Sequence, residues 1–459
     1  MPARKAISLA GLLVLLAAAR AGAVPFPAGA YSLSAADRPA SSRVYTNPSV
    51  AGVAVRTLWQ TLETAEGQFD WSFLDGEIQT ASAAGKKVSL AVGASSRGTP
   101  QWVYDAGAQP YRFIDQNPYH PTYGDTLTMP LPWDPVYLTK WTRFVRALGQ
   151  RYANVTTLSY VKGSSGVVTN GWGLPQTDAL GNSWAAYGYT PETLLAAMQV
   201  VVDSLLAAFP QTPAWVEVGN IKFEPQLSGH VQSYVAEQIA AYGFQRYPDR
   251  FGVWREDISG CTPDPPTSGF WKILWDHRGQ DGAQMLWNVQ DGPTRMNPCG
   301  ITPNDKATVL MAAVQRGLDY GMPYLEIYQE DVLDTAVASV IEFAAEHLGG
   351  GAVGVSRDGR PAAGGLVLRC RPNPSGGRTG EAALEFWLPP SQAGRVRISV
   401  MDVAGRVVAT PIEGELGPGW HSAALDARAP QGGRLASGVY LCQLQAGAVV
   451  RQVRVVILE

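Results

Sequence analysis

Apolar and polar residues follow two different periods along this chain, and the change of period divides it into two parts. Up to residue 348, short apolar runs alternate with segments in which apolar residues recur at helical spacing. From residue 366 onward, apolar residues recur at every second position, which is typical of β-strands. The pattern predicts an α/β domain over residues 24–348 and an all-β domain over residues 366–459, joined by a glycine-rich linker at 349–365.

Eight apolar runs in the first part are predicted to be strands, which is the number that a closed barrel needs. Helical patterns separate several of them, although the first crossover, residues 35–51, lacks a convincing helix. We therefore predict a (β/α)8 TIM barrel, with an open doubly wound sheet as the alternative. The predicted strands are Gly29 to Ser34, Val53 to Trp59, Val88 to Gly93, Leu158 to Gly163, Ala214 to Asn220, Phe251 to Asp257, Gln284 to Val289 and Tyr324 to Tyr328. The predicted helices include Val136 to Tyr152, Pro191 to Phe209, Asn304 to Tyr320 and Leu333 to Leu348.

The second part contains seven short runs separated by turn sequences, a pattern that predicts a small β-sandwich. The runs are Leu366 to Cys370, Ala383 to Leu388, Val396 to Met401, Val407 to Thr410, His421 to Leu425, Gly438 to Leu444 and Val449 to Ile457.

Residues 1–23 are predicted to be a secretory signal peptide. Arg4 and Lys5 precede an apolar run, and small residues at 21–23 provide a cleavage site. A membrane anchor is the alternative, but the run is short for a bilayer span and is interrupted by Arg20. We therefore expect an exported protein whose mature chain has no membrane span.

Composition and motifs exclude several kinds of chemistry. A formal net charge of -3 gives no electrostatic reason to expect nucleic acid or an anionic membrane as partner. The five histidines show no metal-ligand spacing, and there is no phosphate-binding glycine loop or nucleophile elbow. We predict neither a metal nor a cofactor, and a neutral ligand.

Export makes the four cysteines informative, because an oxidising compartment permits disulfides. Cys261 and Cys299 lie in the first part, and Cys370 and Cys442 lie in the second. Pairing within each part leaves no cysteine unmatched. We favour the first pair, in loops after adjacent strands; the second is less certain because each cysteine lies within its own strand.

One segment of the first part follows a known pattern. Its residues are Trp59, Leu62, Glu63, Glu66, Gly67, Phe69 and Asp70, followed by Thr99, Pro100 and Trp102. The segment resembles the barrel glycoside hydrolases, especially the family 42 β-galactosidases. The resemblance covers about fifty residues and implies a (β/α)8 barrel that acts on oligo- or polysaccharide through two carboxyl groups. It further implies an acid/base glutamate after the fourth strand, following an asparagine, and a glutamate nucleophile at the end of the seventh.

The sequence departs from that family where the two glutamates are expected. After the fourth strand, Asn170 is followed by Gly171, and the seventh run ends in Gln290 and Asp291. Another carboxylate has taken over, or the strand numbering is off by one, or the barrel binds sugar without cleaving it. If the first true strand began at Val53, the run with Glu326 and Glu330 would become the seventh.

Three glutamates are the predicted catalytic residues. Glu326 and Glu330 share one face of their predicted strand with Tyr328, and Glu330 is placed nearest the mouth. Their partner must come from another strand, because roughly 13 Å separates them along an extended chain. The best partner is Glu256, with Asp257, Asp291 and Glu217 as further candidates. Candidate partners also have a structural interpretation: Glu256 and Asp257 could be loop carboxylates that pair with Arg255, and Glu217 could be a buried residue bonded to Arg56. Glu63 is expected to be structural and to accept turn N–H groups.

Aromatic residues at strand ends are the predicted sugar-binding surface, since flat rings stack on pyranoses. There are 14 tryptophans. The predicted substrate-binding residues are Arg56, Trp59, Trp102, Asn170, Trp172 and Trp287.

The second part carries its own resemblance, centred on the block ASGVY at residues 436–440. Asn373 and Pro374 precede it, as do Asp402, Gly405, Val407, Gly419, His421 and Asp426. The pattern is similar to the Ig-like domain of flagellar hook-cap proteins and to the C-terminal sorting domain of type IX secretion. It implies an accessory domain that is not the seat of catalysis and that serves either in sorting to the outer-membrane surface by secretion machinery or as a structural module. The closing lysine common in sorting domains is missing.

Together these features predict a secreted bacterial glycosidase that hydrolyses β-linked glycosides. The alternatives are a catalytically inactive surface protein that binds carbohydrate in the same cleft, and a structural adhesion protein.

Overall fold

The computed structural model describes two folded parts of the chain. The residues described are 26–116, 118–163, 184–219, 233–348, 367–371, 382–388, 393–402, 405–417, 419–425, 435–447 and 449–457. The predicted signal peptide (1–23) and linker (349–365) lie outside these residues, as do Asn170 and Trp172.

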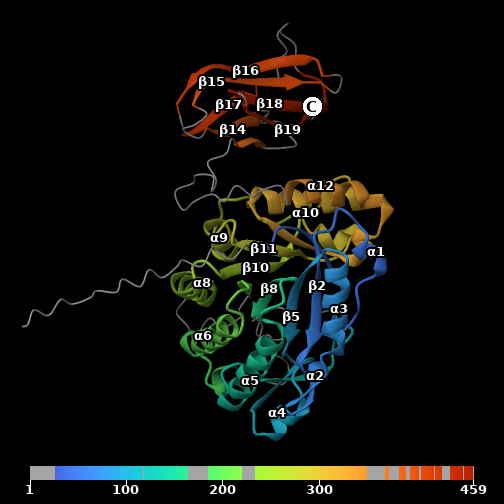
Figure 1. The fold of residues 1–459 in the computed structure, drawn as a ribbon, viewed down its shortest axis with the longest axis vertical. Coiled ribbons are helices and arrows are strands. Elements are labelled where there is room, and N and C mark those ends of the chain that lie inside the picture. Colours follow the sequence, from blue (N-terminus) through green and yellow to red (C-terminus); the bar gives the residue numbers. More distant parts are fainter. Residues whose placement is uncertain are drawn as a thin grey trace, which may run out of the picture.

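The first part is a closed barrel of eight parallel strands surrounded by helices, as predicted (Figure 1). The order around the barrel is β1-β12-β11-β10-β9-β8-β5-β2, so each strand lies beside its neighbours in sequence. The barrel strands are β1 (Gly29–Leu33), β2 (Gly52–Leu58), β5 (Lys87–Gly93), β8 (Leu158–Gly163), β9 (Ala214–Glu217), β10 (Phe251–Ile258), β11 (Asp281–Met285) and β12 (Tyr324–Tyr328).

The pairing of the barrel strands determines how they are numbered. β1 pairs with both β2 and β12, so it is a true barrel strand and β12 is the eighth. The hypothesis that the numbering is off by one is therefore wrong. The seventh strand, β11, begins three residues before the predicted run at Gln284 and ends at Met285.

Helices cover the outside of the barrel. The long ones begin at capping residues: the Asp134 carboxylate accepts from the Tyr137 N–H before α5, and the Thr190 hydroxyl accepts from the Thr193 N–H before α6. The helices are α1 (Ser42–Tyr45), α2 (Trp59–Leu62), α3 (Ser72–Ala83), α4 (Gln101–Asp105), α5 (Pro135–Tyr152), α6 (Pro191–Ala208), α8 (Tyr234–Arg246), α9 (Gly269–Asp276), α10 (Lys306–Asp319), α11 (Gln329–Val332) and α12 (Ala338–Leu348), with 3-10 turns at Trp184–Tyr187, Pro293–Met296 (η2) and Thr335–Val337.

Two small hairpins extend the loops that follow barrel strands. β3 (Glu63–Ala65) pairs with β4 (Gln68–Phe69) after the second barrel strand. β6 (Pro110–Ile114) pairs with β7 (Thr126–Pro130) after the third. Among the described helices, α6 alone is long and apolar enough to cross a membrane, which is weak evidence because it packs on the barrel like a core helix.

A cluster of five large aromatic side chains fills the lower part of the barrel interior: Tyr31, Tyr160, Trp215, Trp254 and Tyr324. Glycines stand opposite them. A Cβ atom at Gly282 would lie 2.5 Å from the Trp215 ring, and one at Gly52 would lie 2.4 Å from the Tyr31 ring. The cluster therefore forms a solid floor, and a ligand site must lie above it, at the carboxyl ends of the strands.

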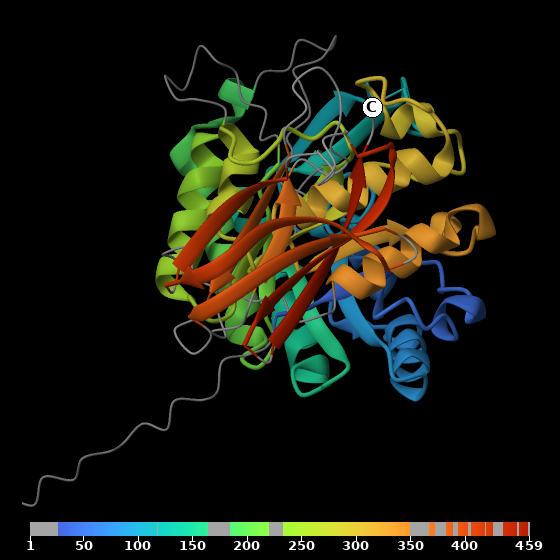
Figure 2. The same cartoon turned by 90° about the horizontal axis from the view of Figure 1, so that it is seen from above.

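The second part consists of two antiparallel sheets, which fit a small all-β domain, and all seven predicted strands are present (Figure 2). One sheet has the order β13-β14-β17 and the other β16-β15-β18-β19. Their strands are β13 (Val367–Arg371), β14 (Ala382–Leu388), β15 (Gly394–Met401), β16 (Val407–Leu416), β17 (Gly419–Leu425), β18 (Gly438–Ala446) and β19 (Val449–Ile457).

The two predicted disulfides have different outcomes. Cys261 and Cys299 form a disulfide with Cα atoms 5.6 Å apart. Cys370 and Cys442 are both buried in the sandwich core, where they are thiols and not a disulfide, so the second predicted pair is not observed. Burial raises the pKa of each of these thiols to about 12, and such groups are poor nucleophiles.

Candidate active site

The mouth of the barrel and the layer beneath it gather charged and polar side chains from five strands. β2 contributes Arg56, β8 Lys162, β9 Glu217, β10 Glu256, and β12 both Glu326 and Tyr328. Burial raises the pKa of the Tyr328 hydroxyl to about 12, and this hydroxyl also feels the charges of Arg56, Glu256, Arg295 and Glu326. The Gln284 amide of β11 donates to the same hydroxyl at 3.3 Å. Tyr328 thus marks the centre of the charged cluster.

A buried ion pair lies directly above the aromatic floor. Lys162 Nζ lies 2.6 Å from Glu326 Oε1, and both side chains are fully buried. The hydroxyls of Tyr160 and Tyr324 donate to the same oxygen at 2.5 and 2.7 Å. Burial alone would raise the pKa of Glu326, but Lys162 and the two tyrosines together lower it, so the group is ionised.

Glu326 therefore lies beneath the mouth as the anion of a buried pair. Glu326 and Tyr328 share the barrel interior, as predicted, but the chain turns into α11 at Gln329, so Glu330 leaves the strand and is exposed. The predicted placement of Glu330 on the same face, nearest the mouth, is wrong for this reason.

Glu217 and Glu256 stand on adjacent strands at the mouth. Glu217 is in register with Trp254, so Glu256 lies two residues further toward the carboxyl end of β10. Strand rise and spacing put their Cα atoms roughly 8 Å apart. The Glu217 side chain is buried and that of Glu256 is half-buried. The chain thus brings two carboxyl groups together without a glutamate at either family position.

The environment of Glu217 favours its neutral form. Burial, followed by repulsion from Glu256, raises the pKa of Glu217 to about 8, and the opposing charge of Arg255 reduces the shift. The Gly219 N–H hydrogen-bonds the carboxyl group, and a Cβ atom at Gly219 would overlap Glu217 Oε1 at 1.7 Å. A larger residue at position 219 would therefore force the Glu217 carboxyl group to move. At neutral pH Glu217 is mostly protonated and can donate a proton.

The other candidate carboxylates have structural partners. Arg255 is buried and binds Asp257 through two nitrogens, one at 2.8 Å, while it donates to the Val218 carbonyl at 3.0 Å. The predicted structural role of Asp257 is therefore confirmed. Asp291 accepts from the Trp287 indole at 2.9 Å and from the Asn288 amide at 3.0 Å.

Arg56 lies in the mouth, where its guanidinium donates twice to the Ser34 carbonyl, at 3.0 and 2.9 Å. It therefore fixes the end of β1 against β2 while its charge faces Tyr328. The proposed pairing of Arg56 with Glu217 is not observed.

Of the three predicted tryptophans that the structure describes, Trp287 alone lies at the rim of the mouth. Trp287 is half-buried, 5.4 Å from the Tyr328 ring and 3.5 Å from the Arg295 guanidinium. Trp59, in contrast, is fully buried among Trp102, Tyr137, Trp141 and Phe144, so it cannot reach a ligand. Trp59 was predicted to face the sugar because its position at a strand end does not reveal that the chain turns there into α2.

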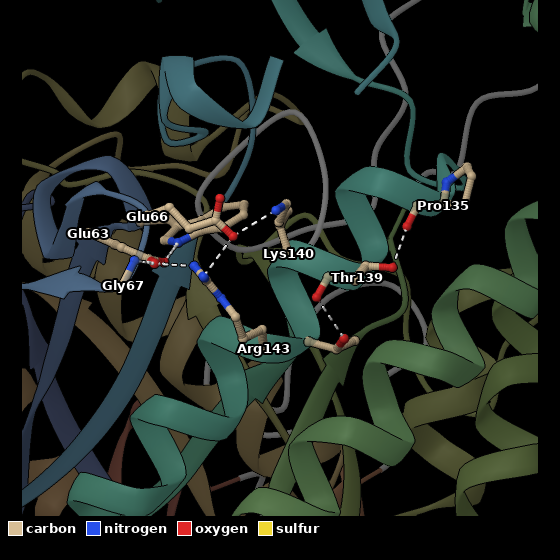
Figure 3. Close-up of polar contacts among 9 residues, drawn as sticks. Glu63, Glu66, Gly67, Pro135, Thr139, Lys140 and Arg143 are labelled. Atoms are coloured by element: carbon tan, nitrogen blue, oxygen red, sulfur yellow. Dashed lines mark hydrogen bonds and ion pairs between the residues drawn. The ribbon is translucent and has the colours of Figure 1, made fainter. Parts of the chain in front are cut away.

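Trp102 and Glu63 belong to the same outer cluster, in which Gly67 and Arg143 bind the Glu63 carboxylate (Figure 3). The Trp102 indole donates to the Glu63 carbonyl at 3.1 Å, and the Arg143 guanidinium lies over its ring. The fully buried Glu63 carboxylate accepts from the Trp59 indole at 2.8 Å, from the Gly67 N–H at 2.6 Å and from Arg143 of α5. The predicted structural role of Glu63 is confirmed, and Trp102 is used by this cluster and not by the mouth.

Sequence reasoning missed Lys162 and Arg295 and gave Glu217 too little weight. A signal existed for Lys162, since it follows Tyr160 with period two in a strand and must share the barrel interior with it. Arg295 had no such signal, because its place depends on how the loop after β11 folds. Within the described residues, no group of three or more histidine, cysteine, aspartate or glutamate side chains could hold a metal ion.

Comparison with solved structures finds glycosidase barrels of low overall similarity. A β-galactosidase from the psychrophilic Marinomonas ef1 is 12% identical with a TM-score of 0.42, over 69% of this chain and 59% of that one. One from Rahnella sp. R3 is 11% identical with a TM-score of 0.38, over 65% and 51%. Endo-glycoceramidase II from Rhodococcus sp. is 13% identical with a TM-score of 0.36, over 86% and 96%. This chain thus spans little more than half of either β-galactosidase, and at these scores the likenesses carry no argument about function.

Comparison of sequences is more specific. No curated protein matches the chain. Residues 43–164 match the sequence model of glycoside hydrolase family 42, described as β-galactosidase. The matched segment runs from α1 to the end of β8 and includes Trp59, Glu63 and Trp102, but it ends before Glu217 and Glu256. The chain therefore has a glycoside hydrolase-like barrel, and the family match supports a glycosidase as its enzyme class.

Proposed function

We propose that this protein is a secreted glycosidase that hydrolyses β-linked carbohydrate with Glu217 as general acid and Glu256 as the second carboxylate. The observation that carries the proposal is the pair itself: two carboxyl groups on adjacent strands of the barrel mouth, one buried and one half-buried. Their environments differ as the two roles require, since the pKa of Glu217 is raised to about 8 by burial and by the charge of Glu256.

In the proposed reaction, Glu217 donates its proton to the glycosidic oxygen while the bond from that oxygen to the anomeric carbon breaks. The Glu256 carboxylate either attacks the anomeric carbon, giving a glycosyl ester that water then hydrolyses, or takes a proton from the attacking water. In the first case the ionised Glu217 accepts a proton from that water as it attacks the anomeric carbon, and the Glu256 carboxylate is released. The configuration of the released sugar distinguishes the two courses.

The cations below and beside the pair support this assignment. The Lys162–Glu326 pair is internally neutralised and places two hydroxyls and an ammonium group under the mouth without exposing them. Arg56 adds a positive charge near Tyr328, which offsets part of the negative charge of Glu256.

The test is a screen of the full chain against aryl β-glycosides and polysaccharides, with Glu217→Gln and Glu256→Gln beside the wild type. Glu330→Gln is the matched control, because this glutamate is exposed on α11. We expect both mouth variants to lose hydrolysis and the control to keep it. Hydrolysis that survives both changes would overturn the site. No hydrolysis by the wild type, together with retained polysaccharide binding, would favour the catalytically inactive carbohydrate-binding alternative.

Export and sorting are part of the same proposal. The Cys261–Cys299 disulfide supports an oxidising compartment, and the ASGVY block of the second part supports an Ig-like accessory domain of the type IX sorting kind. Cell fractionation and mass spectrometry of the purified protein test this proposal. We expect an extracellular or outer-membrane protein that lacks residues 1–23, whereas a cytoplasmic protein retaining them would contradict it.

A further inference from the structure

Three side chains at the rim of the barrel form a layered arrangement, which we name the Arg295 clamp: Tyr119, Arg295 and Trp287. The Arg295 guanidinium carbon lies 4.0 Å from the centre of the Tyr119 ring and 3.5 Å from that of the Trp287 ring. Guanidinium groups stack on aromatic faces through their own faces, which leaves the N–H groups at the edge of the plane available.

The clamp connects opposite sides of the mouth. Tyr119 lies in the loop between β6 and β7, which follows the third barrel strand, and Trp287 and Arg295 follow the seventh. In a barrel of eight strands the third and the seventh are diametrically opposed, so their loops can meet only above the mouth. Trp287 also contacts Tyr328 at 5.4 Å, and the Tyr328 hydroxyl feels the charges of Arg295 and Glu256. The clamp therefore lies close to the proposed catalytic pair.

Both loops of the clamp are held in place by polar contacts. The buried Asp115 carboxylate binds His120 Nδ1 at 3.0 Å and accepts from the Thr122 hydroxyl at 2.6 Å, which fixes the turn beside Tyr119. On the other side, the Trp287 N–H contacts Met296 Sδ at 3.0 Å, next to Arg295 in η2. Cys299 follows three residues later and anchors this loop to Cys261. A clamp held on both sides is preorganised for a ligand.

The charge of Arg295 is not neutralised by an ion pair with any described residue. Among the described residues, its guanidinium makes no hydrogen bond and no ion pair, whereas Arg143, Arg151 and Arg255 are each paired with carboxylates. Asp291 acts on Arg295 only at longer range, and its carboxylate is engaged by Trp287 and Asn288.

Tyr119 adds apolar surface beside this charge, and Tyr123 lies in the same loop, where its N–H donates to the His120 carbonyl at 3.0 Å. The two tyrosines are 60% and 61% exposed. An acidic sugar has a flat pyranose face, which packs on an aromatic ring, and a planar or tetrahedral anion, which accepts hydrogen bonds from a guanidinium. An exposed aromatic surface next to a guanidinium with available N–H groups can make both contacts.

We propose that the Arg295 clamp is an accessory subsite for an anionic saccharide, whose carboxylate or sulfate group binds the edge of Arg295 while its ring packs on Tyr119 or Tyr123. The proposal deepens the proposed function, because the anionic sugar would be a neighbouring unit of the glycan that is cleaved. It assigns the substrate class as a uronate-containing or sulfated glycan in place of a neutral one. Neutral glycans would meet the catalytic pair but not the clamp.

The test measures binding without turnover, on the full chain carrying Glu256→Gln. Two matched ligand pairs are titrated by calorimetry: β-(1→4)-linked oligomannuronates and their methyl esters, and a sulfated galactan with β-linkages and its desulfated form. Each pair differs only in the anionic group. We expect at least one anionic member to bind about tenfold or more tightly than its neutral partner, with an affinity that falls as salt rises. The pair that shows the preference identifies the carboxylate or the sulfate as the group recognised.

Variants separate the clamp from general electrostatics. Arg295→Gln is expected to abolish the preference, while Arg146→Gln, an equal loss of charge on the exposed face of α5, is expected to keep it. Equal binding of both members in both pairs, absence of binding in all four, or a preference that survives Arg295→Gln would overturn the proposal. Thermal unfolding of each variant verifies the fold. If the preference holds but wild-type hydrolysis is absent, the proposed function fails and the subsite stands.

Discussion

Two clusters in this barrel combine glutamate, arginine and tryptophan, yet they serve different ends. In the outer cluster, the Glu63 carboxylate has three donors: the Gly67 N–H and Arg143 (Figure 3), and the Trp59 indole. At the mouth, Glu217 has the Gly219 N–H and a second carboxylate, Glu256, as neighbour. A buried carboxylate whose oxygens are saturated by donors is a structural element, whereas one that is buried beside a like charge keeps its proton and can react.

The two clusters are expected to differ most in how substitutions within them change catalytic activity. Glu217→Gln and Glu256→Gln should each lower kcat/KM by about 10³-fold, because each removes one half of the proton and charge transfer. Glu63→Gln, measured as activity per folded molecule, should stay within about threefold of wild type, a factor worth under 1 kcal/mol. Steady-state kinetics on the glycoside found by screening gives these values. Equal losses in all three variants would erase the distinction between the clusters.

The disulfide beside the mouth is expected to have the next largest effect. Cys261 and Cys299 close a loop of 38 residues, and removing this cross-link should destabilise the barrel by about 4 kcal/mol on the chain-entropy account. Urea unfolding of Cys261→Ser/Cys299→Ser followed by barrel tryptophan fluorescence measures the loss. An unchanged midpoint would show that the loop carrying Arg295 is held by its other contacts alone.

For Glu63→Gln itself, we expect a loss of stability in place of a loss of activity. The amide cannot balance the charge of Arg143 and has one acceptor oxygen for three donors, so the barrel should lose about 3 kcal/mol of unfolding free energy. Arg143→Gln is the companion variant, which removes the cation and leaves both other donors. A Glu63→Gln protein as stable as the wild type would contradict the structural role.

The sequence predicted the fold well but the site only in part, and particular residues show why. The pattern of apolar residues located all eight barrel strands and all seven tail strands. Strands buried on both faces appear in the sequence as short apolar runs, and strands buried on one face appear as alternating apolar residues. The same pattern placed Arg56, Glu256 and Glu326 in the barrel. It could not distinguish Glu326, neutralised by Lys162, from Glu217, left beside Glu256, because that difference depends on which strands are neighbours in space.

Aromatic residues at strand ends were the least predictable. Trp59 and Trp287 occupy similar positions in sequence, yet Trp59 turns into the core between barrel and helix, and Trp287 turns to the rim. The path of the following loop determines whether such a tryptophan lies in the core or at the rim. Loop paths do not produce a periodic pattern of apolar residues in the sequence.

The pH dependence of stability is expected to reflect the protonation of Glu217. Folding raises the pKa of Glu217 from its ordinary value of 4.5 to about 8, so the folded state holds a proton that the unfolded chain releases between these values. Stability from Glu217 is therefore largest below pH 4.5 and falls as pH rises toward 8. Thermal unfolding of wild type and Glu217→Gln across this range gives the difference, which excludes the contributions of the other buried acids, Asp281 and Asp331, whose pKa values are also raised. A parallel pair of curves would contradict the shift.

The leaving-group dependence of Glu217→Gln tests the assigned roles most directly. A 2,4-dinitrophenyl glycoside departs without protonation, whereas a phenyl or alkyl glycoside needs the acid. We predict that Glu217→Gln keeps kcat/KM within about tenfold of wild type on the dinitrophenyl substrate and loses about 10³-fold on the unactivated one, while Glu256→Gln loses both. A Glu217→Gln protein that loses both substrates equally, or neither, would contradict the assignment of Glu217 as the acid of this barrel.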